Sequence, residues 1–154
     1  MDEGKRIAKL FSDWYNGNPW TYVKMTDIIK DVSAEQAAKK LLPNANTIWQ
    51  LVQHCLGWRE NVLLKIQGQE FKSPEDNYLG EPTDVSDNAW KEMLARYEQN
   101  EKNWEEYLNR VSDDELKEPY RPSKNEFTNY EVIHGLLHHD NYHFGQVLML
   151  KKML

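Results

Sequence analysis

The chain has 154 residues, of which 40% are hydrophobic and 29% are charged, a composition typical of an ordinary globular protein. We expect one domain over residues 1–154, because a chain of this length can bury a substantial core without disulfides or metal staples. The formal net charge of -6 argues against a nucleic acid or an anionic membrane as a partner, since both select basic surfaces.

Helical signals cover most of the chain. We expect helices over residues 2–15, 23–30, 47–68 and 86–110 and from 129 to the C-terminus, with short turns after Ser33 and over 113–117. The breaker cluster at 16–19, the Pro- and Gly-containing segment 74–84 and the Pro-containing segment 119–127 predict loops. Four Ser or Thr residues have Glu or Gln three positions later, the pattern of a capping box at a helix start. These pairs are Ser33 with Gln36, Thr47 with Gln50, Ser112 with Glu115, and Thr128 with Glu131.

The predicted elements indicate an all-α protein. No segment shows the two-residue alternation of a half-buried strand. Four long helices favour a four-helix bundle. The connections over 17–46 and 69–85 are too long for plain hairpins, which predicts at least one crossover connection and short helices within the loops.

Four of the five histidines lie in the segment 134–146, HGLLHHDNYHFGQ, on the last predicted helix. With about 100° per residue, His143 lies roughly 40° from His139, inside the arc of the apolar residues. That arc contains Val132, Leu136, Val147, Leu150 and Leu154. His134 and His138 fall on the polar side of the same helix, and we expect them at the surface.

His54 flanks the apolar stripe of the helix predicted over 47–68 in the same way. One inward histidine there and an i, i+4 pair on the last helix can converge on one metal ion inside a bundle. Other interpretations stay open. His54 is equally compatible with a hydrogen-bonded core histidine, and the pair with acid–base or pH-switch chemistry. In an interaction module without metal, His54, His139 and His143 would only pack in the core.

Other residues near the histidines have two interpretations each. Asp140 either orients an imidazole or pairs with a basic residue such as Arg59. Tyr142 and Gln146 either contact a ligand or only pack between helices. We expect Gly57 and Gly145 to allow close helix approach.

The only cysteine, Cys55, makes an intrachain disulfide impossible and predicts a cytoplasmic protein. Its apolar neighbours predict a small buried side chain. The N-terminus does not resemble a signal peptide. No stretch approaches the roughly 18 apolar residues of a transmembrane helix. The aromatic residues fit either a homodimer interface or the core.

Residues 139–146 have the form H-x-x-x-H-x-G-Q, which resembles the C-terminal signature of the DinB/YfiT-like family of metal-dependent enzymes. The segment 47–54, TIWQLVQH, resembles the family's helix that ends in its first metal-binding histidine, and the corner at 17–20 matches more weakly. The resemblance implies a four-helix bundle with a crossover and a divalent ion, zinc or nickel, bound by His54, His139 and His143. Family members often have Arg at the position of Phe144, so the chain departs from the pattern there.

The resemblance also implies a small-molecule substrate. The family contains S-transferases that use low-molecular-weight thiols such as bacillithiol, mycothiol or glutathione. We therefore expect a metal-dependent thiol transferase or a hydrolase, with a catalytic base that the sequence does not identify. The alternative is a non-catalytic four-helix protein that binds a metal or a small ligand. In either case the metal identity and the thiol are not determined by the sequence, because three-histidine sites accept several ions.

Overall fold

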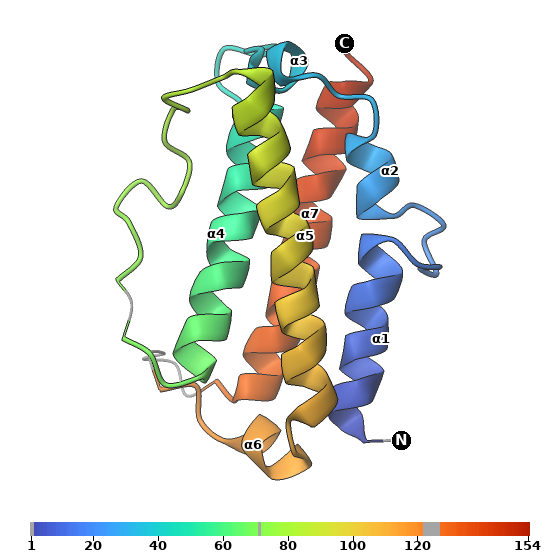
Figure 1. Cartoon of the computed structure of the whole chain (residues 1–154), viewed down its shortest axis with the longest axis vertical. Coiled ribbons are helices and arrows are strands. Elements are labelled where there is room, and N and C mark those ends of the chain that lie inside the picture. Colours follow the sequence, from blue (N-terminus) through green and yellow to red (C-terminus); the bar gives the residue numbers. More distant parts are fainter. Residues whose placement is uncertain (1, 71, 122–126) are drawn as a thin grey trace.

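The computed structural model describes residues 2–70, 72–121 and 127–154, and its long helices form an all-α bundle (Figure 1). The long helices are α1 (Glu3–Tyr15), α4 (Ile48–Ile66), α5 (Asp87–Arg110) and α7 (Asn129–Lys151). The short helices are α2 (Met25–Ile29), α3 (Ala34–Ala38) and α6 (Asp113–Lys117). Within the described ranges there is no strand, only an isolated bridge between Pro119 and Thr128. The expected fold class is confirmed, while part of the loop predicted over 119–127, namely residues 122–126, lies outside the described residues.

Helix starts follow the predicted local chemistry. All four expected capping boxes form, at the starts of α3, α4, α6 and α7. In each box the N-cap hydroxyl accepts a hydrogen bond from the backbone N–H three residues later, and the Gln or Glu there accepts one in return. The start of α5 is capped by Ser86, whose hydroxyl accepts from the Ala89 N–H at 3.2 Å. The helix that carries His54 and the helix that carries His139 and His143 therefore begin at the residues that the capping boxes predicted.

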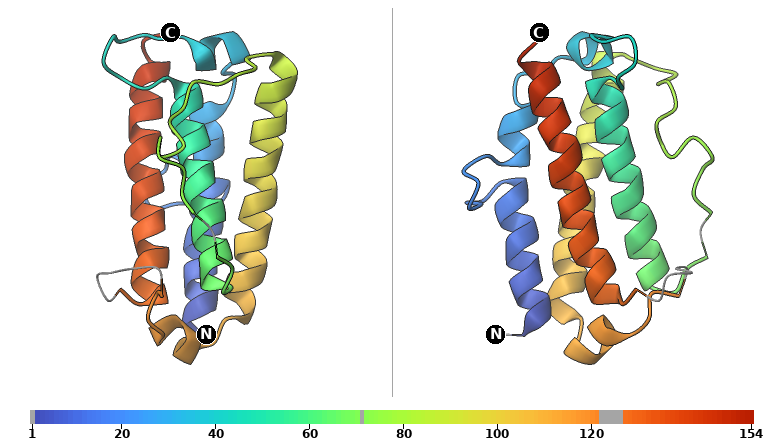
Figure 2. Two further views of the ribbon diagram at one scale, coloured as in Figure 1. Left: turned by 90° about the vertical axis from the view of Figure 1, so that its left-hand side faces the viewer. Right: turned by 180° about the vertical axis from the view of Figure 1, so that it is seen from behind.

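The connection between α4 and α5 is the predicted crossover. Both helices run in the same direction, so the chain must return along the bundle after α4 (Figure 1). Figure 2 shows that the returning segment passes along the outer side of α4. We call residues 72–86 of it the strap. α4 lies between α5 and α7, and α1 packs against α5.

The core has two apolar clusters separated by a charged layer. One cluster contains Trp14, Trp90 and Phe144, at the end of the bundle where α3 lies, and the other contains Phe11 and Trp104, toward α6. The charged layer between them consists of fully or nearly fully buried polar residues from α4, α5 and α7. These residues are Arg59, Asn100, Glu101 and Asp140. A layer of this kind demands that its partners be matched, because an unpaired buried charge is costly.

The buried face of α7 is rotated from the predicted one. Its buried side chains include Ile133, Asp140, Phe144 and Val147, so the stripe is centred near Asp140. His139 and His143 lie at its edge, half-buried, and Leu154 is exposed. The predicted arc did not include Ile133 and Phe144, and these two buried residues extend the stripe on the side where Asp140 is buried beside Arg59. Phe144 packs edge-on against Trp14, so position 144 faces the core and not the histidines.

Candidate metal site

Three imidazoles converge between α4 and α7. His54 Nε2 lies 2.9 Å from His139 Nε2 and 3.1 Å from His143 Nε2. Nitrogens bound to one zinc ion at about 2.0–2.1 Å in a tetrahedral arrangement lie roughly 3.3 Å apart. The three ring nitrogens are therefore grouped at nearly the spacing that a single ion requires, and the three residues form a group that could hold a metal ion.

Hydrogen bonds at the far side of two rings determine their tautomers. His54 Nδ1 lies 2.6 Å from the backbone carbonyl of Asn77, and His143 Nδ1 lies 2.9 Å from Gln146 Oε1. Both partners are acceptors, so each Nδ1 carries the proton and each Nε2 of the neutral ring has a free lone pair. Lone pairs that face each other at this distance repel unless a cation or a proton lies between them. The donor set therefore fits a divalent ion.

Burial keeps these rings neutral. Desolvation lowers the pKa of His54, against the opposing effect of the bond to Asn77, and nearby His143 and His139 lower it further. Desolvation also lowers the pKa of His143, and the bond to Gln146 opposes that shift. Only neutral imidazole has a lone pair for a metal, so both shifts favour the metal-binding form.

The third ring lies next to the charged layer. His139 Nδ1 is 3.6 Å from Asp140 Oδ1, and among the described residues neither buried atom has a hydrogen-bond partner. The other oxygen of Asp140 accepts from Arg59 Nη1 at 2.8 Å. Arg59 also donates to Asn100 Oδ1 at 3.0 Å and to Glu101. Both interpretations of Asp140 are thus compatible with its position, and its ion pair with Arg59 is formed.

The strap holds His54 from outside the bundle. Asn77 and Tyr78 have φ angles of 56° and 62°, the left-handed region, and this turn aims the Asn77 carbonyl at His54. The Tyr78 hydroxyl accepts from Asn61 Nδ2 at 2.7 Å. A Cβ on Gly57 would lie 2.4 Å from the Tyr78 ring. Gly57 is therefore required for the approach of the strap, and the prediction that it serves helix packing is wrong.

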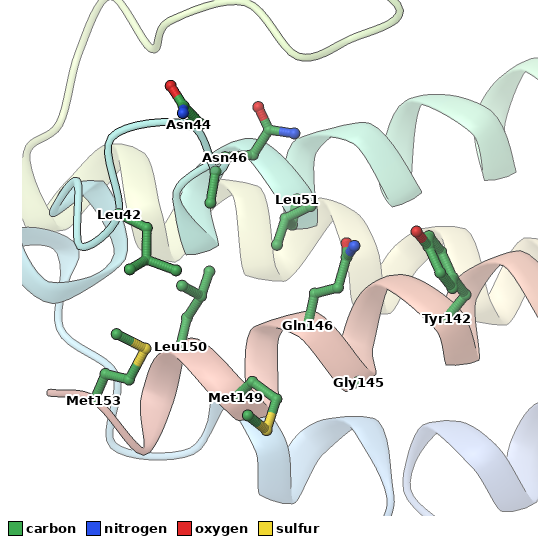
Figure 3. A pocket seen from close by; sticks show the side chains of 11 residues that line it. Leu42, Asn44, Asn46, Leu51, Tyr142, Gly145, Gln146, Met149, Leu150 and Met153 are labelled. Carbon is green, nitrogen blue, oxygen red and sulfur yellow. The ribbon is translucent and has the colours of Figure 1, made fainter.

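A cavity is lined by Gln146, the residue whose Oε1 accepts from His143 Nδ1. Figure 3 shows the side chains that line it. This amide-lined cavity has a volume of about 550 Å³. Its walls come from α7, the start of α4 and the segment before α4, and include Asn44, Asn46, Leu51, Tyr142, Gln146 and Met149. Tyr142 and Gln146 therefore lie where a ligand can reach them. Gly145 lines the same cavity, and no described atom lies within 4 Å of a Cβ built on it, so it does not serve close helix packing either.

A second cavity opens on the His139 side. This aromatic-lined cavity has a volume of about 540 Å³. It is bounded by Trp58, Val62, Tyr120, Phe127, Glu131, Val132, Gly135, Leu136 and His139. The histidine cluster thus has one cavity against His139 and another against the residue that orients His143.

Cys55, His139 and Asp140 form a second group whose ligand atoms lie within 4.8 Å of one another. Cys55 is fully buried, as predicted, and desolvation raises the pKa of its thiol well above the ordinary value. A protonated thiol is a poor ligand, because metals bind the thiolate. The three histidines are therefore the better candidate site.

The remaining histidines lie apart from this cluster. His138 is exposed, as expected. His134 is half-buried rather than exposed, and its ring packs 4.4 Å, between centroids, from Tyr130. Two residues that support the site were not among the sequence-based candidates. Asn77 lies in a polar loop without periodicity, whereas Glu101 interrupts the apolar stripe of α5, which is a signal that a helical wheel could have detected.

No helix in the described ranges is long and apolar enough to cross a membrane. No curated protein and no solved structure gives a significant match to the chain. A family model, described as the DinB superfamily, matches residues 20–147. The matched region includes the three converging histidines, all of α4 and most of α7. The chain therefore belongs to the DinB superfamily.

Proposed function

We propose that this protein is a metal-dependent enzyme in which His54, His139 and His143 bind one divalent ion, zinc or nickel. We further propose that it acts on a small molecule, either by transferring a low-molecular-weight thiol or by hydrolysis. The observation that carries the proposal is the convergence of three Nε2 atoms, two of them deprotonated because their Nδ1 atoms donate to Asn77 and Gln146.

The residues around the cluster would prepare it for the ion. Asn77 and Gln146 hold two rings in the orientation and tautomer that binding needs. Asp140 is the acceptor available to the third ring, because its free oxygen lies 3.6 Å from His139 Nδ1. A divalent ion held by three neutral imidazoles keeps its positive charge and lowers the pKa of a water or thiol that binds at an open position.

The cavities support a small-molecule substrate. Each has a volume in the range of small-ligand sites, about 550 and 540 Å³. His139 lines one of them, and Gln146, the partner of His143, lines the other. A substrate in the aromatic-lined cavity would therefore contact His139, and one in the amide-lined cavity would contact the residue that orients His143.

Metal content is the first test. The full chain, purified without a histidine tag and reconstituted with zinc or nickel, is expected to hold about one ion per chain. The His139→Ala variant is expected to hold almost none. His138→Ala is the matched control, because this exposed histidine lies on the same helix one position away. A wild-type protein without bound metal, or equal losses in both variants, would contradict the proposal.

Turnover is the second test. Consumption of a low-molecular-weight thiol with an electrophile, or hydrolysis of an activated ester, is to be measured on the metal-loaded protein. Loss of turnover in His54→Ala together with loss of metal supports the enzyme. Stoichiometric metal without either reaction favours the alternative, a non-catalytic protein that uses the ion to hold a small ligand.

A further inference from the structure

The walls of the aromatic-lined cavity are mostly apolar, although it lies beside a polar cluster. The side chains of Val62, Phe127, Val132 and Leu136 have no polar atom. His139 is the contact between this space and the histidine cluster. A molecule bound at the cluster therefore has an apolar chamber next to it.

Two other wall residues, Trp58 and Tyr120, have a polar atom but add no charge to the cavity. Trp58 donates its Nε1–H to Asn77 Oδ1 at 2.9 Å, so the indole offers the cavity only its ring. The Trp58 ring also packs edge-on against His139, 6.4 Å between centroids. Burial raises the pKa of Tyr120 to about 12, so this phenol stays uncharged near neutral pH.

One wall residue carries a charge. Glu131 uses Oε2 to accept hydrogen bonds from the Thr128 N–H and hydroxyl in the capping box of α7. These bonds lower the pKa of Glu131, so it is anionic at neutral pH. An anionic substrate tail would face this carboxylate, and none of the described residues that bound the cavity is a lysine or arginine that could pair with it.

From these walls we infer that the aromatic-lined cavity binds a neutral aromatic or similarly flat apolar group of the substrate, while the head group of the same molecule binds at the three-histidine cluster. This inference rests on the proposed metal site and adds the substrate class to it. Rings stack or pack edge-on with Trp58, Tyr120 and Phe127, which provide aromatic surface on the cavity wall.

Gly135 supplies a direct test. It lines this cavity, and no described atom lies within 4 Å of a Cβ built on it. A larger side chain there would fill the space. The substitution also removes a mid-helix glycine, so it should not weaken the helix. Gly145 is the matched control, because it has the same open surroundings on the same helix but lines the amide-lined cavity.

The probes are three thiols that share a metal-binding sulfur: benzyl mercaptan, 2-mercaptoethanol and cysteamine. Their affinities are to be measured on the cobalt-loaded full chain from the cobalt–thiolate absorption. Burial of the ring predicts that benzyl mercaptan binds about tenfold to a hundredfold more tightly than 2-mercaptoethanol. The preference is expected to shrink in Gly135→Ala, to vanish in Gly135→Leu, and to persist in Gly145→Ala and Gly145→Leu.

The outcomes separate this inference from the proposed function. If cobalt binds but benzyl mercaptan shows no preference, or if the Gly145 variants lose it equally, the apolar subsite is overturned and the metal site stands. Tighter binding of cysteamine than of benzyl mercaptan would also overturn it, because the cavity would then select a cation through Glu131. If cobalt does not bind to the wild-type chain, both the metal site and the subsite fail.

Discussion

His54 Nε2 and His139 Nε2 lie 2.9 Å apart, although the two residues are 85 positions apart in the chain. The contact crosses the interface between α4 and α7. The Nδ1–H of His54 donates to the Asn77 carbonyl, so His54 Nε2 presents a lone pair toward the rings on α7. An ion bound by His54, His139 and His143 would join the two helices, so metal binding and folding stability would be thermodynamically linked.

The first prediction concerns removal of the metal. Zinc at 100 times its dissociation constant is expected to stabilise the wild-type chain by about 2.7 kcal/mol, or roughly 5–10 °C in Tm. The measurement is thermal unfolding with zinc and with EDTA. His54→Ala should show almost no difference between the two conditions. A zinc-dependent shift that survives in this variant would mean that the ion stabilises the chain elsewhere.

The second prediction concerns Gln146, which accepts from His143 Nδ1. Gln146→Leu removes the acceptor and should weaken metal affinity by about tenfold to a hundredfold. Gln146→Glu keeps an acceptor oxygen and should retain the affinity. Competition with a chromogenic chelator measures both. Equal affinity of the Leu variant and the wild type would show that Gln146 does not orient the ligand.

The third prediction concerns pH. Burial lowers the folded-state pKa of His54, His143 and His134 below the ordinary value of 6.5. The unfolded chain therefore binds more protons between the folded and unfolded pKa values. Stability of the metal-free protein is fully present above pH 6.5 and falls as the pH drops from 6.5 to the folded-state values, below which these groups cause no further loss.

Urea unfolding of the metal-free protein at several values from about pH 5 to 7.5, roughly the range in which histidines titrate, measures how steeply the unfolding free energy changes with pH. The His54→Gln, His143→Gln double variant should have a shallower slope, because two of the groups no longer titrate. His138→Gln is the control, since this histidine is exposed. An unchanged slope in the double variant would place the acid sensitivity in other groups.

The fourth prediction concerns the buried pair of Arg59 and Asp140, both 0% exposed. Asp140→Asn leaves part of the Arg59 charge uncompensated and should cost about 3–5 kcal/mol of unfolding free energy. Glu60→Gln breaks the exposed pair with Arg96 and should cost no more than about 1 kcal/mol. Urea unfolding compares the two variants. Similar small costs would mean that Glu101 alone satisfies Arg59.

The fifth prediction concerns the contact between the strap and α4. A Cβ at Gly57 would lie 2.4 Å from the Tyr78 ring, so Gly57→Ala should displace the strap and cost about 1–3 kcal/mol. Because Asn77 is the neighbour of Tyr78 and orients His54, the variant should also bind zinc more weakly. Gly145→Ala, in open surroundings, should be neutral or slightly stabilising. Unfolding free energy and zinc titration test both statements.

The helices and their starts follow from local signals. Capping boxes at Ser33, Thr47, Ser112 and Thr128 depend on residues three positions apart, and each forms as expected. The i, i+4 spacing of His139 and His143 also belongs to one helix. Such features are readable because a helix imposes its geometry on any short segment that adopts it.

Local signals did not predict which side of α7 is buried. The wheel put the apolar stripe around His139, whereas the buried stripe is centred near Asp140. A carboxylate becomes a core residue only when a partner such as Arg59 neutralises it, and that partner lies 81 positions away. No periodicity rule contains this information.

The sequence alone determined the all-α class, the helix boundaries, the crossover and the three candidate histidines, because these depend on short-range spacing or on a motif. Only the tertiary structure decided that the three Nε2 atoms converge, that the Asn77 carbonyl orients His54, and that an aromatic-lined cavity adjoins His139. Those relationships join α4, α7 and the strap. They arise from the packing of segments whose contacts are set by burial and charge pairing across the whole bundle, and not by any local pattern.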